Sequence, residues 1–515
     1  MKRTALTLVL CLAALFAARE ARAGGFEIYE HSALATGMAD ARTALWDDPS
    51  SLFYNPAAIA ELDGYQLVIG DTLIFAENKY DPALPDCESP TDTGCGEPAK
   101  TKSHVFYPLH LYFTAEITRW LKVGSGVNNP FGLGTFWPPD WDGRFTAWQT
   151  DLKTFFFQPT LAIEIARLAH LPEDFAIAIG VGGYYVYSQA LIRSKLYDAG
   201  LMDPDDSANM KLEGSGHGGG YHFSLFAAWK PWISLGASVR SNVPVNYSGT
   251  ANFWAPEGEV WADFMRMTGL LPEKTGGSTR IEMPWNMNFG LAFHGLKKFT
   301  FAIDVYVTLW ESYDTLKVHF DCADIPAGEP GSCAAILNQE AVYPKKWHTG
   351  VQLSFGAEYR PIRALAIRLG YGYVTDPSNP AYYDAMLPDG NRHLICFGIG
   401  YRAPRIFKMD LGYMLAFWEG TKDNDIGVEY ESEVRNAGAN GKYKTMSHLL
   451  GITIGLSFGG AYKGEPQTLD PRPEPPREAL LPAPTADAIA PEAAPAVEAA
   501  PAPVVPAPVP ATEPI

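Results

Sequence analysis

Regular alternation of apolar residues with small or polar ones constrains the fold of this chain more than any other feature of its sequence. From Leu365 to Tyr373 every second residue is Leu, Ile or Tyr, and the residues between them are Ala, Arg or Gly. The stretches 299–309 and 450–458 repeat the pattern with Phe, Ile, Val and Leu. A spacing of two places alternate side chains on opposite faces of a β-strand. Soluble sandwiches alternate too, so the pattern predicts strands and leaves open whether their apolar face meets a core or lipid.

The lengths of the strands and of their connections distinguish these two environments. Fourteen candidate strands lie near residues 65–77, 104–118, 120–128, 151–166, 174–192, 211–229, 232–250, 281–294, 298–320, 346–360, 363–375, 392–402, 407–420 and 443–458. Many exceed the usual length of strands in soluble sheets. Very short links, such as 230–231 and 361–362, alternate strictly with long ones, such as 129–150 and 251–280. An even strand number with tight turns at one rim and long loops at the other is typical of a bacterial outer-membrane β-barrel.

The two ends of the chain carry different signals. Residues 1–23 join two basic residues to a short apolar run and end in Ala-Arg-Ala, which predicts a secretory signal peptide. From residue 465 onward the chain is rich in Pro and Ala and has no aromatic residue, which predicts a disordered tail at 459–515. An even number of strands returns both ends to the short-turn rim, so we expect the N- and C-termini to be periplasmic.

The predicted barrel at 65–458 needs something to fill its interior. Fourteen strands enclose more space than the side chains of the wall fill. The stretch 24–64 is the uncommitted segment of suitable length, and it holds short helical patterns such as 33–45. We therefore predict an all-β transmembrane barrel of 14 antiparallel strands, with an N-terminal lumenal hatch of short helices at 24–64 and a Pro/Ala-rich periplasmic tail.

Charge and motif content argue against several classes of function. The net charge of −18 argues against nucleic acid, which requires a basic footprint. The histidines lack a Ser or Asp partner in any recognisable catalytic motif, so we expect no enzyme activity, no cofactor and no metal. A structural barrel that tethers the outer membrane through its tail is a further alternative, and the sequence identifies no partner for that tail.

The cysteines are spaced for local pairing. Cys87 and Cys95 share one Pro/Asp/Gly-rich segment, and Cys322 and Cys333 share another. In an exported chain this spacing predicts the disulfides Cys87–Cys95 and Cys322–Cys333. The alternative, a metal site, would need His or further Cys at ligand spacing nearby. Cys396 is left without a partner, and the sequence does not say which face of its strand it occupies.

Several short motifs occur in an order that resembles a known family. They are Gly25-Phe26, Ala35-Thr36-Gly37-Met38-Ala39, Asn55-Pro56-Ala57, Asn129-Pro130-Phe131-Gly132-Leu133, Trp141-Asp142-Gly143-Arg144, Tyr247-Ser248-Gly249 and Arg368-Leu369-Gly370-Tyr371. Together they resemble the outer-membrane long-chain fatty acid transporters and their aromatic-hydrocarbon relatives, the FadL/TodX family, over residues 24–458. The resemblance implies a fourteen-stranded barrel with a hatch, and a ligand route from hydrophobic outer loops to an interior pocket and then sideways through the wall.

The resemblance also implies a position for the side exit. In that family a kink in the third strand opens the wall beside the Asn-Pro-Ala turn of the hatch, which here corresponds to 123–133 facing Asn55, Pro56 and Ala57. The sequence supports an interruption, because this stretch holds the poor ladder residues Gly124, Gly126, Asn128, Asn129 and Pro130. The alternative is that these residues only end a short strand before a loop.

Two predicted outer loops and three arginines are the candidate ligand contacts. The loop residues are Phe131, Leu133, Phe136, Trp137, Trp141, Phe145, Phe253, Trp254, Trp261, Phe264 and Leu270. Exposed apolar surface of this extent favours ligand capture, and the alternative is that the loops pack over the barrel mouth. The candidate contacts for a ligand carboxylate are Arg144, Arg240 and Arg368. The alternative for each arginine is an ion-pair network that joins hatch to wall.

These features together predict passive transport. We expect uptake of hydrophobic molecules, foremost long-chain fatty acids, across the bacterial outer membrane by loop capture, lumenal binding and lateral exit. Aromatic hydrocarbons such as toluene are the alternative substrates. The expected partners are the hydrophobic ligand, outer-membrane lipid and the barrel-assembly machinery.

Overall fold

The computed structural model of the protein describes residues 24–83, 96–196, 208–254, 272–326, 329, 332–333, 340–383, 386–403, 406–419, 422–423 and 439–458. The chain divides into two compact units, Met1–Leu469 and Asp470–Ile515, and all of the described residues belong to the first. The predicted signal peptide and tail both lie outside the described residues.

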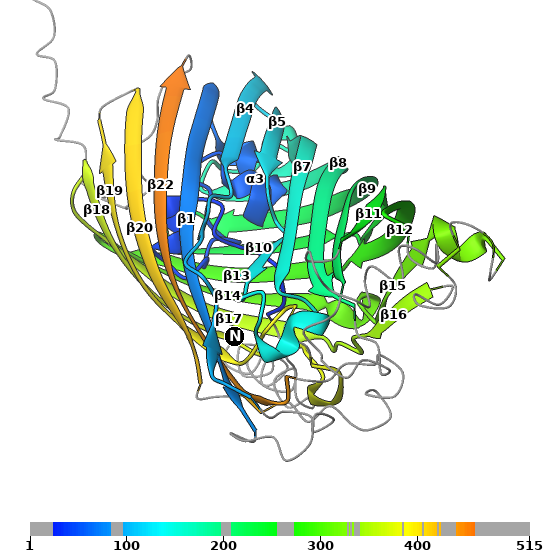
Figure 1. Cartoon of the computed structure of the whole chain (residues 1–515). Coiled ribbons are helices and arrows are strands. Elements are labelled where there is room, and N and C mark those ends of the chain that lie inside the picture. The colour runs from blue at the N-terminus through cyan, green and yellow to red at the C-terminus, as the bar shows by residue number, and fades with distance from the viewer. Residues whose placement is uncertain are drawn as a thin grey trace, which may run out of the picture. The chain divides into compact units, whose positions relative to one another are not determined.

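One continuous antiparallel sheet accounts for most of the first unit (Figure 1). Its strands are β1 (Tyr65–Pro82), β2 (Ala99–Lys100), β3 (Val105–Phe106), β4 (His110–Thr118), β5 (Leu121–Asn128), β6 (Gly132–Phe136), β7 (Gln149–Glu164), β8 (Phe175–Lys195), β9 (Asn209–Trp229), β10 (Ile233–Arg240), β11 (Val243–Trp254), β12 (Lys274–Met283), β13 (Trp285–Leu296), β14 (Phe299–Leu309), β15 (Thr315–Phe320), β16 (Glu340–Pro344), β17 (Gly350–Ile362), β18 (Leu365–Val374), β19 (Arg392–Arg402), β20 (Phe407–Trp418), β21 (Lys422–Asp423) and β22 (Gly441–Phe458).

The helical elements are short. They are the α-helices α2 (Ala33–Thr36), α3 (Ser51–Tyr54) and α4 (Ile165–Leu168), and the 3-10 turns η1 (Pro56–Glu61), η2 (Asp142–Phe145), η4 (Trp310–Ser312), η5 (Asp321–Asp324) and η6 (Pro380–Tyr382). In the part of the chain that the structure describes, no helix is both long and apolar enough to cross a membrane.

The first and last strands pair with each other and close the sheet. The β1–β22 ladder runs from Tyr65 opposite Phe458 to Pro82 opposite Gly441. Several wall strands are interrupted. The elements β2, β3 and β4 form one wall strand, and so do β5 with β6, β10 with β11, β12 with β13, β14 with β15, β16 with β17 and β20 with β21. Counted in this way, the wall is a closed barrel of 14 antiparallel strands, as predicted. Closure pairs the backbone groups internally, which a bilayer requires of any strand that spans it.

The apolar face points outward in the middle part of the wall. Ile69, Leu225, Ile303, Leu369 and Ile452 are each more than a third exposed, although all lie in the middle of paired strands. The alternate residues of the same strands are small or polar and face the interior, here called the lumen. Large apolar side chains without protein neighbours around a closed sheet are suited to lipid rather than to water.

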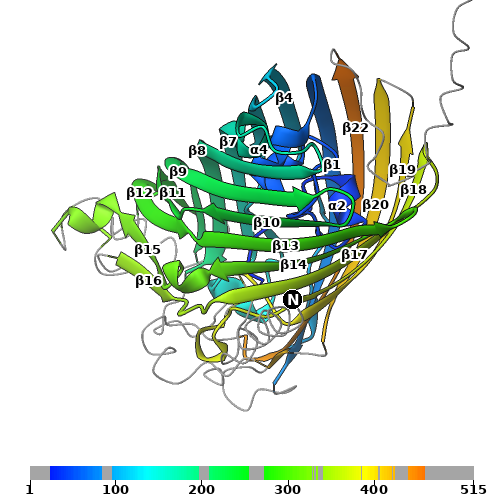
Figure 2. The same ribbon diagram turned by 180° about the vertical axis from the view of Figure 1, so that it is seen from behind.

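Residues 24–64 form the hatch, and they pack inside the barrel. Its helix α2 lies against β19, β20 and β22, and its turn η1 lies against β7, β8 and β9. Figures 1 and 2 view the barrel from opposite sides, and in both the hatch elements are enclosed by the wall. The helical pattern predicted at 33–45 is helical only over Ala33–Thr36, because Ala39 and Asp40 adopt positive φ values of 51° and 65° and end it.

Wall glycines allow the hatch backbone to approach closely. A Cβ at Gly370 would lie 2.4 Å from the backbone of Met38 and Ala39. Beside this contact, Asp304 accepts hydrogen bonds from the backbone N–H groups of Arg42 and Thr43 at 2.7 and 2.6 Å. Small and polar residues on the inner face are therefore matched to the hatch rather than to an open channel.

Buried ion pairs add to the attachment of the hatch. Arg42 pairs with Asp47 inside the hatch, and Lys408 of β20 pairs with Asp48 at 2.9 Å. Lys230, which follows β9, pairs with Glu61 at 2.6 Å. Burial opposes the ionisation of Asp48, but Lys408 overcomes this effect and holds the pKa of Asp48 below its usual value. The hatch is thus joined to the wall through charged contacts on both sides of the lumen.

Candidate functional site

The third wall strand is broken at residues 129–131. Before the break in the chain, β5 pairs with β4 and with β7. After the break, β6 pairs with β7 alone among the described residues. The next contact with the second strand is a single hydrogen bond from Lys102 N to Phe136 O, at 2.7 Å. The ladder between the second and third strands is therefore interrupted over residues 103–109 and 129–135.

The start of the hatch supplies backbone partners at the break. Ile28 N donates to Pro130 O at 2.8 Å, and Gly132 N donates to Phe26 O at 2.9 Å. We call Phe26–Ile28 the N-terminal clamp. Unpaired backbone groups are costly away from water, so these two bonds stabilise a kink that the wall ladder leaves unpaired. Thr154 of β7 completes the arrangement, because its hydroxyl bonds both the N–H and the C=O of Phe131.

Side chains cover the interrupted part of the wall. The ring of Phe106 lies against Gly134, and the ring of His104 packs on that of Phe136 with centroids 4.4 Å apart. Just below, Tyr107 and Leu109 are strongly exposed on the outer face. The wall is closed here by side-chain packing and not by a ladder of backbone hydrogen bonds, so this part of the wall opens at a lower energetic cost than a paired part.

A cavity in the lumen adjoins the break. Its apolar lining comes from Phe53, Pro130, Phe131, Phe156, Tyr184, Val243 and Met283. Its polar lining comes from Glu27, Asn128, Gln158, Arg240, Ser241 and Asn286. Mostly apolar walls with a few convergent polar groups are typical of the lining of a small-molecule site. With the clamp docked, the free volume is about 10 Å³, which is room for one water molecule. Because Pro130 and Phe131 belong both to the cavity and to the kink, the cavity lies directly behind the weak part of the wall.

The clamp itself fills part of this region. Phe26 packs on Trp310, Tyr313 and Phe131, with ring centroids 4.6, 5.4 and 5.9 Å away. Next to it, the carboxylate of Glu27 is buried. Burial raises the pKa of Glu27 to about 7, although Arg240 and the hydrogen bonds to the carboxylate act in the opposite direction. A ligand that reached the polar end of the cavity would have to displace the clamp from this space.

The structure separates the three candidate arginines. Arg240 lines the cavity, where its guanidinium lies 3.9 Å from the centroid of the Phe53 ring and bonds the Phe53 carbonyl. Arg368 is buried between Glu358 and Asp410, at 2.7 and 2.6 Å, and does not line the cavity.

The third candidate, Arg144, lies in an outer loop. It donates to the Trp141 carbonyl at 3.1 Å and stacks over the Phe145 ring. Of the three arginines, Arg240 is the one placed to meet a ligand in the cavity.

The Asn-Pro-Ala turn lies elsewhere than expected. Asn55 donates to the carbonyls of Thr43 and Leu225 at 2.8 and 3.0 Å, and Ala57 N donates to Ser224 Oγ at 2.8 Å. These contacts attach Asn55, Pro56 and Ala57 to β9, not to the kink. The expectation that this turn faces the third-strand kink is wrong in this structure, because the clamp holds that position.

The predicted kink residues fall into two groups. Gly124, Gly126 and Asn128 belong to β5, within the intact ladder, and Gly124 faces Leu52 and Ile59 of the hatch. Asn129 and Pro130 lie at the break itself, where Asn129 donates to the Thr154 carbonyl. In the pairing with β7 the interruption is therefore confined to the Asn-Pro pair and Phe131. The alternative of a strand that simply ends does not apply, because β6 resumes this pairing.

Most of the described loop aromatics are covered. Phe131, Trp137, Trp141 and Phe253 are buried, so the expectation that they form an exposed surface is wrong. Trp137 stacks on Trp141 with ring centroids 4.3 Å apart, and both belong to a buried cluster with Tyr80 and Tyr443. Packing of these rings against one another removes them from water. Leu133, Phe136 and Phe145 are half-buried, and Trp254 is exposed. Trp261, Phe264 and Leu270 lie outside the described residues.

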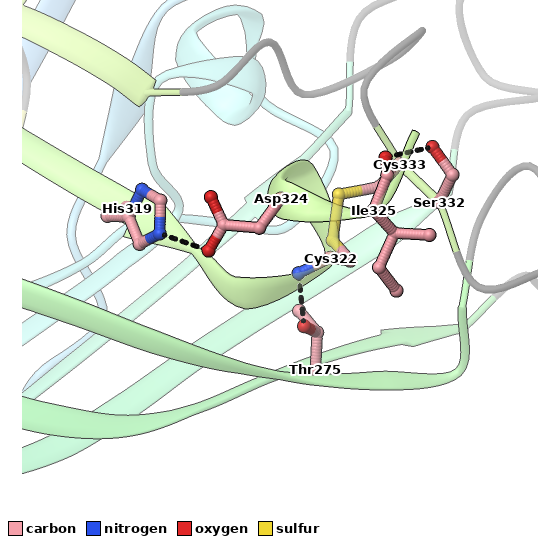
Figure 3. Close-up of a disulfide and its surroundings, with 7 residues drawn as sticks. All are labelled: Thr275, His319, Cys322, Asp324, Ile325, Ser332 and Cys333. Atoms are coloured by element: carbon pink, nitrogen blue, oxygen red, sulfur yellow. Dashed lines mark hydrogen bonds and ion pairs between the residues drawn. A yellow bond between two sulfur atoms is a disulfide. The ribbon is translucent and has the colours of Figure 1, made fainter. Parts of the chain in front are cut away.

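The cysteines differ in what the structure describes. Cys322 and Cys333 form a disulfide beside η5, and the Cys322 N–H donates to Thr275 at 3.0 Å (Figure 3). His319, near the end of β15, lies 3.1 Å from Asp324 of η5. Cys87 and Cys95 lie outside the described residues. Cys396 is a buried free thiol that faces the lumen.

Sequence reasoning did not identify Phe26 and Glu27 as site residues. Their positions depend on how the hatch enters the barrel, which no local pattern encodes. The polar groups that surround Glu27 had a weak signal, since the alternation places Asn286 on the inner face of β13. Thr308 follows the same rule on β14.

A closed barrel with a lipid-facing exterior, an internal hatch and a cavity behind a break in its wall defines a plugged transmembrane channel. The family model described as outer membrane protein transport protein (OMPP1/FadL/TodX) matches residues 14–458, and the chain belongs to this family. Its members are outer-membrane transporters of hydrophobic molecules, not enzymes.

Relatives span nearly the same length. The putative outer membrane protein NMB0088 of Neisseria meningitidis is 23% identical over 471 residues, which cover 87% of this chain and 98% of that protein. Outer membrane protein P1 of Haemophilus influenzae is 22% identical over 488 residues, with coverage of 87% and 98%.

Solved structures agree in fold. A Pseudomonas aeruginosa FadL homologue superposes with a TM-score of 0.70 at 16% identity, covering 85% of this chain and 100% of that chain. The Ralstonia pickettii toluene transporter TbuX superposes with a TM-score of 0.59 at 14% identity, covering 83% and 98%. At these identities the likeness concerns the fold and is compatible with either class of substrate.

Proposed function

We propose that this protein carries long-chain fatty acids passively across the outer membrane, and that they leave the barrel sideways through the break in the third wall strand. The observation that carries the proposal is the position of the cavity directly behind that break. Pro130 and Phe131 line the cavity and also form the kink. A ligand in the cavity is thus separated from lipid by side chains and the clamp.

The energetics of the two exits favour the lateral one. A path along the barrel axis would have to dislodge hatch residues that are held by buried ion pairs and by Asp304. Breaking one buried ion pair typically costs about 3–5 kcal/mol. The lateral path disturbs two backbone hydrogen bonds of the clamp, each of which contributes about 1 kcal/mol, together with the packing of a few rings. It also breaks the hydrogen bonds of the Glu27 carboxylate, which an incoming carboxylate can replace.

The topology of uptake follows from the same proposal. The rim with long loops faces the outside and receives the ligand, where Trp254 offers an exposed apolar side chain. The rim with short turns and both chain ends face the periplasm. Insertion of such a barrel requires the barrel-assembly machinery, and lipid surrounds its apolar outer face.

Uptake measurements test the function directly. Cells with the protein should accumulate labelled oleate faster than cells without it, and labelled toluene serves as the second probe. Faster uptake of toluene alone would replace the fatty acid assignment with an aromatic hydrocarbon one. Equal rates for both probes with and without the protein would refute the transport proposal.

Cross-linking tests the lateral exit. In the double variant Phe106→Cys/Gly134→Cys, a short bis-maleimide should join the two edges of the interrupted ladder, because the Phe106 ring lies against Gly134. Uptake should fall to background while oleate binding in the lumen persists. The control is Val181→Cys/Phe223→Cys, a facing pair in the intact β8–β9 ladder. If both cross-linked variants transport at the wild-type rate, the lateral exit is wrong.

Aromatic hydrocarbons are the second candidate substrates. The observation that favours them is the aromatic content of the cavity, where Phe53, Phe131, Phe156 and Tyr184 are all available for ring contacts. Such contacts suit a flat ring and need no charged group. This candidate does not explain the charged and polar groups that share the cavity, which include Arg240 and Asn286.

A further inference from the structure

A carboxylate is already present at the polar end of the cavity. Both oxygens of Glu27 are hydrogen bonded: Oε1 accepts from Asn286 Nδ2 at 3.0 Å, and Oε2 accepts from the hydroxyls of Tyr29 and Thr308, each at 2.8 Å. Arg240 lines the same cavity and interacts electrostatically with the carboxylate. Donors directed at both oxygens, with a cation nearby, form a built site for a carboxylate group.

Two residues of this site belong to the barrel wall, and both also bond the hydroxyl of the hatch residue Tyr29, at 2.7 Å from Asn286 and 2.9 Å from Thr308. Asn286 belongs to β13 and Thr308 to β14, and their side chains are buried and face the lumen. Asn286 also bonds Thr308 directly, at 3.0 Å. We call Asn286 and Thr308 the wall cradle. Because these donors are fixed by the barrel, they remain in place when the clamp leaves.

The segment that holds Glu27 resembles an amphiphile in its contacts. The carboxylate of Glu27 occupies the cradle, while the adjacent Phe26 buries an apolar ring among Phe131, Trp310 and Tyr313. The same segment provides the backbone bonds to the kink at Pro130 and Gly132. Occupation of the cradle by Glu27 and closure of the wall are therefore properties of one three-residue segment.

We propose that Glu27 is a resident competitor for the carboxylate of an incoming ligand, so that an acid which takes the wall cradle displaces the clamp from the kink. This inference rests on the proposed function and adds a specificity-determining residue to it. A neutral hydrocarbon has no group that competes for Asn286 and Thr308, so it does not release the clamp through this site. An aliphatic acid does, because it offers the same two oxygens.

Competition of this kind has a measurable consequence. Consider a ligand that binds only when the clamp has left the cradle. Its apparent affinity equals its intrinsic affinity multiplied by the fraction of molecules in that state. Removing the carboxylate of Glu27 vacates the cradle and removes this reduction for acids. The affinity for a ligand of the same length without a carboxylate stays as it was.

Matched ligands isolate the carboxylate in the experiment. The full-length protein in nanodiscs is titrated with radiolabelled oleate and with oleyl alcohol, which share one chain and differ in the head group. Glu27→Ala is expected to bind oleate about tenfold more tightly than the wild type and oleyl alcohol within about twofold. Glu27→Gln retains the size of the side chain and occupies the cradle without a buried charge, so it is expected to bind oleate no more tightly than the wild type.

A second substitution distinguishes competition from simple charge repulsion. Adding Thr308→Val to Glu27→Ala should cancel most of the gain for oleate, because the ligand carboxylate then lacks a cradle donor. The control is Thr300→Val, a buried inward-facing threonine of the same strand outside the site. Folding of each variant is checked by its mobility on gels before and after heating.

Two results would overturn the inference. One is an equal shift for oleate and oleyl alcohol in Glu27→Ala, which would make Glu27 a purely structural residue. The other is a gain for oleate that Thr308→Val leaves intact, which would indicate repulsion without a shared site. Either result can occur in a protein that takes up oleate, whereas failure of the proposed function would appear as absent uptake by the wild type.

Discussion

Replacing Arg368 by Met is expected to lower the free energy of unfolding by about 3 kcal/mol. The guanidinium lies 2.7 Å from Glu358 and 2.6 Å from Asp410, and all three side chains are buried. Without it, Glu358 still has Arg360 at 2.6 Å. Asp410 has no other ion-pair partner in the described part of the chain. One orphaned carboxylate places the cost near the lower end of the range of about 3–5 kcal/mol for a broken buried pair.

Urea unfolding of the barrel in lipid vesicles, followed by tryptophan fluorescence, measures this cost. The matched control is the double variant Arg368→Met/Asp410→Asn, in which the orphaned charge is removed. It should recover most of the lost stability, because replacing a whole buried pair by neutral groups is often close to neutral. The single and double variants have the same Met side chain, so packing changes at position 368 cancel in the comparison.

The reasoning fails if Arg368→Met unfolds at the urea concentration of the wild type, or if the double variant is as unstable as the single one. A second readout separates structure from ligand binding. Oleate affinity in nanodiscs should be unchanged in Arg368→Met, because Arg368 does not line the cavity. A selective loss of oleate binding with normal stability would instead make Arg368 a ligand contact.

Three further changes have defined outcomes. The pKa of Glu27 is raised to about 7 from 4.5, and the other titratable groups that face it are Arg240 and Tyr29. Docking of the clamp is therefore fully stabilised below about pH 4.5 and weakens as the pH rises through 7. Hydrogen exchange of the clamp, corrected for intrinsic rates, should accelerate over this window, and Glu27→Gln should show no such change. Gly370→Leu should impair barrel folding on heat-modifiability gels, because its side chain would meet the hatch backbone, whereas Ile367→Leu, in the same strand, should not. Deleting residues 465–515 should leave oleate uptake intact. Loss of envelope integrity with normal uptake would support the tethering role. Loss of uptake would contradict a transport function that resides in the barrel.

The wall could be predicted from the sequence because its rules are local. Alternation along β18 and β22 assigns each residue to lipid or lumen without reference to any distant residue, and Leu369 and Ile452 are exposed on the outer face as expected. Short turns then fix which strands are neighbours. The same rule placed Arg368, Glu358 and Asp410 on the inner face, and only the three-dimensional register showed that they pair with one another.

The site was less predictable because it depends on segments that meet across the lumen. Trp137 and Trp141 were expected to be exposed, since nothing in their loop indicates the neighbours that bury them. Those neighbours, Tyr80 and Tyr443, lie on the first and last strands, at the seam where the barrel closes. A composition rich in aromatic residues is equally consistent with a capture surface and with a packed cluster, so the sequence left both readings open.

The choice of Glu at position 27 has opposing effects on the closed state, and this balance suits a gate that a passive ligand must open. Hydrogen bonds from Asn286 and Thr308 and the burial of Phe26 favour docking of the clamp. Burial of an ionised carboxylate opposes it, as the raised pKa of Glu27 indicates. A neutral residue would occupy the cradle without this opposing term and would require more binding energy from the ligand. A resident acid at this position keeps the wall closed in the absence of ligand while leaving it open to displacement by another acid.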